Sequence, residues 1–333
     1  MATRWGICSA GKICHDFVVA LQTLPAEDHQ IVAVAASGLL RAEEFAKSHG
    51  IPKAYGSYAE LAVDPTVDVV YVGVVNAKHH EVGLLFLRAG KNVLCEKPLA
   101  MNLKEVQELI SAARENKVFL MEAFWTRFFP AIRQMRTLLA QDTVGDIIAV
   151  NAEFGANIDY SRQKHVKETG CSSLLDIGCY CVQLASMVFK GEKPQLIQAT
   201  GILNEQGVDE MMSIVLKFPS KGLATCLCTG VTQLPSRALI IGAKGYIELP
   251  FTMWCPTVLV VNGQETQYPL PSTSHPLNYI NSVGLRYEAE EVRQCLLKGM
   301  KECPLMPLAE SELIASILDE ARRQVGVVFP QDS

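Results

Sequence analysis

The sequence predicts an α/β domain followed by an α+β domain, on three observations. The chain has 333 residues, more than a single hydrophobic core usually organises. In its first third, continuously apolar runs alternate with helix-like segments. After about Glu122, short strand-like runs follow one another with few helices between them. We therefore assign residues 1–122 to the first domain and residues 123–333 to the second.

The first domain is expected to contain a parallel sheet. Strands are predicted where short apolar runs contain β-branched residues, and helices where apolar residues recur three and four positions apart. Strands that are apolar throughout are typical of a sheet covered on both faces, and their alternation with helices indicates a Rossmann fold. In chain order we expect strand 5–8, helix 13–24, strand 31–36, helix 41–49, strand 67–75, helix 79–89, strand 92–95, helix 103–116 and strand 118–121.

The second domain is expected to contain a large, mostly antiparallel open sheet with helices gathered on one side. Turn signals such as Asn262-Gly263 and Pro219-Ser220 separate its strand-like runs. In chain order we expect helix 128–139, strand 147–154, helix 177–189, strands 197–203, 211–218, 222–229, 238–241, 246–248 and 257–261, and helices 287–298 and 309–325.

Charge and composition exclude several classes of partner. The formal net charge of -5 and the pI near 5.9 argue against a nucleic-acid or membrane surface, because either needs a basic face. No apolar run is expected to reach the length of a membrane span, and no signal peptide is expected before the first strand. We therefore expect a cytoplasmic protein that binds a small molecule.

The cysteines agree with that expectation. Their number, 11, is odd, and they are scattered along the chain, as is typical of free thiols in a reducing cytosol. The closest pairs, Cys179/Cys181 and Cys226/Cys228, have one intervening residue. Zinc sites more often show wider spacing with further Cys or His partners, so no metal is expected.

A candidate phosphate-binding loop follows the first strand. Residues 9–14, Ser-Ala-Gly-Lys-Ile-Cys, lie where a Gly-x-Gly-x-x-Gly/Ala fingerprint would connect strand and helix. Only Gly11 is intact, and Ser9 and Cys14 are small substitutes for the other two glycines. The helix N-terminus would supply amide donors and a favourable dipole to a pyrophosphate, although a tight turn without a ligand is the alternative. The residues expected to contact the cofactor are Ser9, Ala10, Gly11, Lys12 and Ile13.

The end of the second strand indicates which cofactor is bound. NAD enzymes usually place Asp or Glu there to hold the ribose hydroxyls. This chain has Ser37-Gly38-Leu39-Leu40-Arg41 instead. With no carboxylate to repel it, a 2′-phosphate could accept hydrogen bonds from Ser37 and pair with Arg41. We therefore expect NADP rather than NAD, with a solvated helix residue as the alternative interpretation of Arg41.

A second motif stands at the end of the next-to-last strand of the first domain. It reads Cys95-Glu96-Lys97-Pro98. Ligands of open α/β sheets bind outside the carboxyl ends of the strands, so this turn is expected to face the cofactor. Pro98 fixes the backbone and Lys97 is expected to point into the crevice. The alternative is an ordinary surface Glu-Lys pair.

These motifs resemble the Gfo/Idh/MocA family of oxidoreductases, and the resemblance spans essentially the whole chain. Within the family, the chain is similar to the branch of dimeric dihydrodiol dehydrogenases that also act as NADP-dependent D-xylose dehydrogenases. The family likeness rests on residues 6–13, Val74-Val75-Asn76-x-x-His79, Cys95-Glu96-Lys97-Pro98 and Leu174-Leu175-Asp176-Ile177-Gly178-x-Tyr180. The likeness to the branch rests on residues 55–58, 121–130, 180–183 and 329–332.

The resemblance implies an activity and an assembly. An enzyme of this branch would oxidise trans-dihydrodiols of aromatic hydrocarbons to catechols, and D-xylose to D-xylono-1,5-lactone, with NADP as hydride acceptor. A homodimer formed through the sheet of the second domain is also implied. Two alternatives stay open: another sugar oxidoreductase of the family, such as an anhydro-sugar reductase, and a non-catalytic NADP-binding regulator.

The resemblance also implies the catalytic residues. Tyr180 is the candidate base for the substrate hydroxyl, and the positive charge of Lys97 would favour its phenolate. Many relatives have His where this chain has Tyr180, whereas the dihydrodiol dehydrogenases have Tyr. Asp176 lies four residues earlier and shares a face with Tyr180 if the segment is helical. It would orient Lys97 or a substrate hydroxyl, and a helix N-cap is the alternative.

Further residues are expected around the cofactor and the substrate. Asn76, His79 and Glu96 would border the cofactor, although His79 could also be an exposed helix start. Trp125, Phe154 and Tyr279 would form an aromatic wall for a dihydrodiol ring, and plain core aromatics are the alternative.

Two departures from the branch bear on these expectations. Relatives often carry a basic residue at the position of Ser37, so this departure points to a weaker preference for NADP. Cys171-Ser172 replaces a glycine pair before the Leu-Leu-Asp motif. Glycine allows backbone conformations that other residues avoid, so the loop below the substrate is expected to have a different shape.

Overall fold

The computed structural model describes residues 2–158 and 166–333, which form two compact units. Unit 1 consists of Met1–Ala100, Lys104–Trp125 and Leu270–Leu308, and unit 2 of Met101–Leu103, Thr126–Pro269 and Ala309–Ser333. The predicted division after residue 122 falls close to the passage from unit 1 to unit 2. The segment 270–308, however, belongs with unit 1 rather than with the remainder of the predicted second domain.

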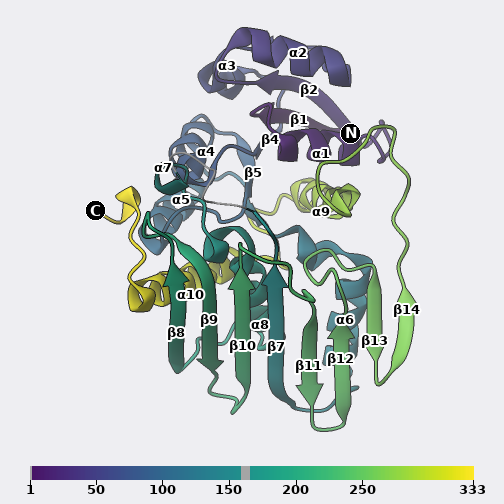
Figure 1. Ribbon diagram of the computed structural model, residues 1–333. Helices are drawn as coiled ribbons and strands as arrows, with labels where there is room; N and C mark the ends of the chain where they lie inside the picture. Colours follow the sequence, from purple (N-terminus) through teal and green to yellow (C-terminus); the bar gives the residue numbers. More distant parts are fainter. Residues whose placement is uncertain (1, 159–165) are drawn as a thin grey trace. The chain divides into compact units, whose positions relative to one another are not determined.

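Unit 1 contains a six-stranded parallel sheet of order β3-β2-β1-β4-β5-β6, drawn in purple to blue in Figure 1. This is the strand order of a dinucleotide-binding Rossmann fold, as the sequence predicts. β4 is buried along its whole length, which explains its continuous apolar run. The strands are β1 (Thr3–Cys8), β2 (His29–Ala35), β3 (Ala54–Tyr55), β4 (Val69–Val72), β5 (Asn92–Glu96) and β6 (Leu120–Ala123). The helices are α1 (Lys12–Leu21), α2 (Leu39–His49), α3 (Tyr58–Val63), α4 (His79–Arg88), α5 (Leu103–Glu115) and α9 (Leu285–Leu297).

The segment 270–308 joins unit 1 because α9 packs on α1. Arg293 of α9 forms an ion pair with Asp28, and Glu290 lies 2.8 Å from the Nε2 atom of His29. The amphipathic pattern of α9 shows that the helix buries one face, but it does not show against which domain. The sequence therefore could not show that α9 packs on α1, and its predicted assignment to the second domain is wrong.

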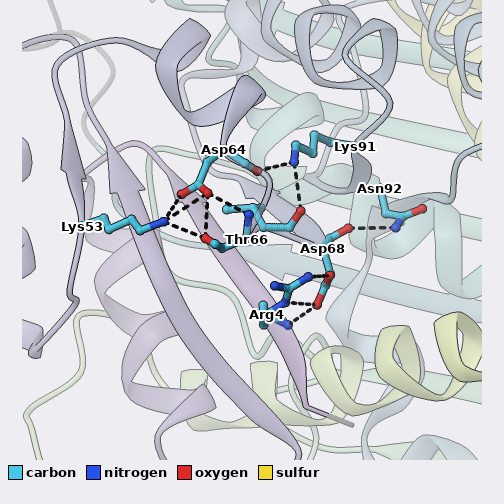
Figure 2. A network of polar contacts seen from close by, with 8 residues as sticks. Arg4, Lys53, Asp64, Thr66, Asp68, Lys91 and Asn92 are labelled. Carbon is cyan, nitrogen blue, oxygen red and sulfur yellow. Dashed lines mark hydrogen bonds and ion pairs between the residues drawn. The ribbon is translucent and has the colours of Figure 1, made fainter.

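Polar side chains connect the amino ends of the unit 1 strands (Figure 2). Lys53 Nζ donates to Asp64 Oδ2 at 3.0 Å, and Arg4 pairs with Asp68 at 2.6 Å. Lys91 Nζ donates to the Asp64 and Val67 carbonyl oxygens. Burial opposes ionisation of Asp64, but hydrogen bonds from Thr66, Lys53 and Tyr55 hold the pKa of its carboxyl well below the ordinary range.

Unit 2 contains an eight-stranded sheet of order β14-β13-β12-β11-β7-β10-β9-β8 (Figure 1). Among the described strand pairs of this sheet, only β7–β10 is parallel, so the sheet is mostly antiparallel, as predicted. Helices α6 and α8 pack against one face of it. The strands are β7 (Ile147–Gly155), β8 (Leu196–Leu203), β9 (Asp209–Lys217), β10 (Leu223–Thr229), β11 (Ala238–Gly242), β12 (Gly245–Leu249), β13 (Val258–Val261) and β14 (Gln264–Gln267). The helices are α6 (Pro130–Ala140), α7 (Val166–Thr169), α8 (Cys179–Val188) and α10 (Leu308–Val325).

Four short elements, β3, α3, α7 and β14, are absent from the predicted list. β14 consists of four exposed residues, so it has no apolar alternation to reveal it. β3 has two residues, and α3 has six and begins after Ser57, whose side chain accepts from the Glu60 backbone N–H. Such elements are formed by pairing and capping rather than by periodicity.

One helical stretch among the described residues, Lys167–Val188, is long and apolar enough to cross a membrane by length and composition. This corrects the expectation that no apolar run reaches that length. The stretch is rich in Gly, Ser and Cys, so no continuous aliphatic run marks it in the sequence. Most of its apolar window, 83%, is buried inside the protein, which is the behaviour of a core helix.

Candidate active site

A cavity of about 600 Å³ lies at the carboxyl ends of β1, β2 and β4 in unit 1. The strand order reverses between β1 and β4, and open α/β sheets bind their ligands at such a switch point. The predicted cofactor residues Ser9, Gly11, Lys12 and Ile13 line it together with Ser37 and Arg41. The other lining residues are Tyr58, Gly73, Val74, Val75, Lys78, Glu81, Val82 and Tyr279.

The loop after β1 has the geometry of a phosphate-binding turn. Ser9 stands at the first fingerprint position with φ of 96°, a region that favours glycine. Gly11 precedes α1, and an added Cβ there would meet only Ser9 Oγ at 3.5 Å and the Gly73 carbonyl oxygen at 3.9 Å. The protein itself therefore leaves room at Gly11, and that room opens into the cavity.

Cys14 fills the third fingerprint position as a packing residue. Its side chain is buried, and its thiol contacts the carbonyl oxygens of Cys8 and Gly73. Burial raises the pKa of Cys14 to about 12, so it stays a neutral thiol. An added Cβ at Gly73 would lie 2.6 Å from the Cys14 sulfur, so the bare backbone there lets the loop after β4 approach α1.

The charge of the cavity suits an anion. Lys12, Arg41 and Lys78 line it, against the single carboxylate of Glu81. Lys78 and Glu81 pair with each other at 2.7 Å, which leaves Lys12 and Arg41 as the net positive charge. The Arg41 guanidinium donates to the Ala10 carbonyl oxygen at 3.3 Å and so lies beside the fingerprint loop. The Arg41 side chain lines the cavity and is exposed to solvent.

Three buried polar side chains hold the turn that carries Lys97. Glu96 accepts from the Lys97 backbone N–H at 3.2 Å, and Glu122 accepts from the Leu99 backbone N–H at 2.9 Å. His79 Nδ1 lies 2.7 Å from the Pro98 carbonyl oxygen. The peptide between Lys97 and Pro98 is cis. Every residue of the turn is thus anchored, which fixes where the Lys97 side chain starts.

Glu96, at the end of β5, and His79, at the start of α4, contact this turn through buried side chains. Glu96 is buried at the end of β5 and accepts from the Tyr71 hydroxyl at 2.6 Å. Burial raises the pKa of Glu96 and lowers that of His79 to about 4. The second ring nitrogen of His79 lies 3.0 Å from the Val74 carbonyl oxygen, so the ring bridges the loops after β4 and β5. Neither side chain is among those that line the cavity, and His79 is not the exposed helix start of the alternative interpretation.

The segment that places Tyr279 at the cavity is held by Asp16, a residue that the sequence reasoning missed. Asp16 is fully buried on α1 and accepts from the backbone N–H groups of Asn278 and Tyr279 and from the Ser282 hydroxyl at 2.6 Å. These bonds fix the segment around Tyr279. The signal was present in the sequence, since Asp16 is an acidic residue on the apolar face of a predicted helix.

Asn76 begins the short helical turn that follows Val75.

Tyr180, Asp176 and Phe154 belong to unit 2. Tyr180 is buried near the start of α8, with its ring centroid 5.8 Å from that of Phe154 on β7. Phe154 in turn stacks on Trp254 at 4.0 Å, an aromatic residue that the sequence reasoning missed. Trp125, which ends the segment Lys104–Trp125 of unit 1, is buried.

Asp176 lies inside a helical run and is not its N-cap. It belongs to the π-helical turn Leu174–Gly178, which continues directly into α8 and is preceded by Ser173. A π-helical turn often occurs at functional sites, and its wider spacing keeps residues four apart close to one face. Asp176 and Tyr180 therefore share a face approximately, as the sequence predicts.

Asp209 anchors this helical run, and sequence reasoning gave no signal for it. Its Oδ2 atom accepts from the Leu174 backbone N–H at 2.7 Å. Ser173 donates to the Glu210 carbonyl oxygen at 2.8 Å and accepts from the Gly230 backbone N–H. Burial raises the pKa of Asp209 to about 6. The start of β9 thus fixes the helical turns that carry Asp176 and Tyr180.

Comparison with known proteins agrees with this geometry. Residues 3–124 match the oxidoreductase family with an NAD-binding Rossmann fold, and residues 132–248 match the GFO/IDH/MocA C-terminal domain. The chain belongs to the Gfo/Idh/MocA family of oxidoreductases. Its first unit is accordingly an NAD(P)-binding Rossmann domain.

Two full-length relatives carry the same name. The trans-1,2-dihydrobenzene-1,2-diol dehydrogenase of Danio rerio is 61% identical over 336 residues, covering 100% of both chains. The protein of that name from Homo sapiens is 49% identical over 332 residues, covering 100% of this chain and 99% of the relative.

Solved structures share the fold at lower identity. A levoglucosan dehydrogenase in complex with NADH and levoglucosan superposes with a TM-score of 0.85 at 18% identity, over 98% of each chain. A 3-ketoreductase from Actinomadura kijaniata, in complex with NADP and TDP-benzene, gives 0.79 at 23% identity, again over 98% of each.

Proposed function

We propose that the chain is an NADP-dependent dehydrogenase that oxidises trans-dihydrodiols of aromatic hydrocarbons to catechols and D-xylose to D-xylono-1,5-lactone. The observation that carries the proposal is full-length identity of 49–61% to proteins named trans-1,2-dihydrobenzene-1,2-diol dehydrogenase. The cationic cavity at the switch point of the unit 1 sheet supports it.

The residues of this cavity fit NADP. The amide donors at the start of α1 and the room at Gly11 suit a pyrophosphate. Ser37 and Arg41 lie after β2, where no carboxylate stands to repel a 2′-phosphate. When bound, NADP accepts the hydride from the alcohol carbon. The protein has to hold the nicotinamide ring of the cofactor and remove the proton of the substrate hydroxyl.

Tyr180 is the proposed base that removes this proton. A tyrosine hydroxyl has an ordinary pKa of about 10, too high for efficient proton transfer at neutral pH. We propose that the ammonium group of Lys97 stabilises the phenolate and that Asp176 orients a substrate hydroxyl or Lys97. The anchored turn of Lys97 and the anchored helical run of Tyr180 support these roles, since both need fixed positions.

Aromatic side chains are proposed to hold the hydrocarbon ring of a dihydrodiol. Phe154 and Trp254 form a stacked pair next to Tyr180, and Trp125 is added from the likeness to the dihydrodiol dehydrogenases. Tyr279 lines the cofactor cavity, so we propose that it contacts the cofactor as well as the substrate.

We also propose a cytosolic homodimer formed through the open face of the unit 2 sheet. Cross-strand pairing aligns one row of residues across six strands, and that row is exposed or half-exposed. Apolar side chains predominate in it, which is typical of a surface that a partner covers. The row consists of Leu196, Lys217, Leu223, Ala149, Ile241 and Tyr246. The buried free thiols of the described chain suit a reducing compartment.

Steady-state turnover tests the proposed function. The purified chain with NADP⁺ and a trans-dihydrodiol of benzene or naphthalene should produce reduced cofactor, followed by its absorbance, and D-xylose should do so in a parallel assay. Tyr180→Phe should lower kcat by roughly 100-fold or more while cofactor binding is kept. Tyr268→Phe, at a half-buried tyrosine outside the proposed dimer row, is the matched control. Tyr180→Phe turning over as fast as the wild type would remove the proposed mechanism.

A further inference from the structure

A carboxylate and two thiols meet at the end of α9 in unit 1. Glu291 and Cys295 lie four residues apart on that helix, and therefore on one face. The helix is followed by Gly299 in a left-handed conformation, which turns the chain back toward Cys303. One ligand atom of each of the three residues lies within 4.8 Å of the others.

The Cys303 sulfur is placed by a tight turn. Cys303 and Met306 form an isolated antiparallel bridge, with Pro304 and Leu305 between them. The Met306 backbone N–H donates to the Cys303 carbonyl oxygen at 3.2 Å. The bridge and this hydrogen bond fix the backbone of Cys303, whose sulfur lies within 4.8 Å of the other two ligand atoms.

The surroundings suit an ion that enters from solvent. Cys295 and Cys303 are 2% and 0% exposed, whereas Glu291 is half-buried, so the group opens on its carboxylate side. None of the three residues lines the cofactor cavity. Across residues 2–158 and 166–333, this is the one group of three Cys, His or acidic side chains with ligand atoms so close.

We propose that Glu291, Cys295 and Cys303 bind one Zn²⁺ ion, with water as the fourth ligand. Two sulfurs and one carboxylate oxygen form a donor set that zinc accepts in tetrahedral geometry. Zn–S bonds of about 2.3 Å place tetrahedral sulfurs about 3.8 Å apart, so side-chain movements of about 1 Å complete the site. Binding forms two Zn–S bonds and releases the two thiol protons to solvent, with no change of oxidation state.

The site would be structural. It joins α9 to the turn whose Lys301 carbonyl oxygen accepts from the Leu120 backbone N–H at 3.2 Å, at the start of edge strand β6. The ion would therefore stabilise the edge of the nucleotide-binding sheet without touching the reacting atoms. The sequence does not indicate this site, because Cys303 follows Cys295 by eight positions rather than at a common zinc-binding spacing, and the third ligand is a glutamate.

Cobalt titration of the full chain tests the proposal. The protein is treated with a chelator, kept reduced with a phosphine and titrated with Co²⁺. About one equivalent should bind and give a thiolate-to-cobalt charge-transfer band in the near ultraviolet, and Zn²⁺ should displace it and raise the Tm. Cys295→Ser and Cys303→Ser should each abolish the band. Glu291→Gln, at a half-exposed position that keeps the fold, should weaken Co²⁺ binding at least tenfold.

Cys171→Ser is the control, since it removes a half-exposed thiol elsewhere and should leave the band unchanged. A band that survives in Cys303→Ser, or an unchanged affinity in Glu291→Gln, would assign the metal to another place. Binding without a thiolate band would show an adventitious carboxylate site only. A Cys295–Cys303 disulfide formed in air by protein that binds no Co²⁺ when reduced would show a redox pair in place of a metal site.

Discussion

Ser9 occupies a backbone conformation that glycine adopts at lower cost. Its φ of 96° lies in a region that L side chains rarely populate, and its backbone N–H donates to the Ala35 carbonyl oxygen at 2.9 Å. A residue held in such a region costs about 1–3 kcal/mol. The side chain also gives a hydrogen bond to the Cys14 thiol, which offsets part of that cost. The fingerprint loop thus keeps its shape although its first glycine is absent.

Ser9→Gly is expected to stabilise the protein. The relief of backbone strain, reduced by the lost hydrogen bond and by the greater freedom of glycine in the unfolded chain, should raise the free energy of unfolding by about 1 kcal/mol. Thermal unfolding should show a Tm higher by a few degrees. Ser48→Gly, in the regular conformation of α2, is the control and should lower the Tm. A Tm for Ser9→Gly that falls as far as that of Ser48→Gly would mean that the backbone of Ser9 carries no strain.

At the scale of elements, the main helices and strands were predictable because their periodicity is strong. β4 is buried throughout and α5 presents one apolar face, so each follows from its pattern alone. β14 and β3 lack such a pattern and depend on pairing with neighbours. The partner of α9 was not predictable either, because its side-chain contacts with Asp28 and His29 join residues 261 and 265 positions apart.

The candidate site was predictable to a similar extent. The loop after β1, Arg41 and the Lys97 turn follow from motifs at the ends of strands. The segments around Tyr279, Lys97 and Tyr180 are held by carboxylates that accept from backbone N–H groups distant in sequence, namely Asp16, Glu122 and Asp209. No spacing rule marks such partners. His79 was predicted as a cofactor neighbour, yet its contacts are with the carbonyl oxygens of the two loops.

The polar network at the amino ends of the strands predicts an acid-sensitive contribution to stability. The folded-state pKa of Asp64 lies below its ordinary value of 3.8, so its charged form stabilises the fold above that pH. Asp64→Asn should lower the free energy of unfolding at pH 7 by about 2 kcal/mol, because a buried charged acceptor is lost. The difference from wild type should shrink as the pH falls below 3.8, measured by urea unfolding. An equal loss at pH 7 and at acid pH would show that the carboxylate charge plays no part.

At the scale of the whole molecule, the open face of the unit 2 sheet predicts self-association. A shallow depression of about 520 Å³ lies on this face, lined by residues from β7 and β9–β12. Leu223 stands in the exposed row and is 47% exposed in the single chain. A second copy would bury it, because monomeric proteins rarely leave such rows uncovered.

Leu223→Asp should therefore convert a dimer into a monomer in sedimentation or light-scattering measurements. A charge placed in a covered apolar face is left without water, which weakens the dimer by several kcal/mol. Leu297→Asp, at a residue of unit 1 that is 55% exposed, is the matched control and should stay dimeric. A wild-type monomer at micromolar concentration, or a dimer that survives Leu223→Asp, would place the interface elsewhere or remove it.

The central claim is that the cations of the unit 1 cavity make this oxidoreductase an NADP enzyme for dihydrodiols. It is tested most directly by kcat/KM for NADP⁺ and for NAD⁺, measured with a saturating trans-dihydrodiol on wild type and on Arg41→Ala. Wild type should prefer NADP⁺, and Arg41→Ala should lose roughly tenfold to a hundredfold with NADP⁺ and little with NAD⁺, the effect of one charge-assisted contact to a phosphate. Equal use of both cofactors by wild type, or an Arg41→Ala variant with unchanged preference, would contradict the account.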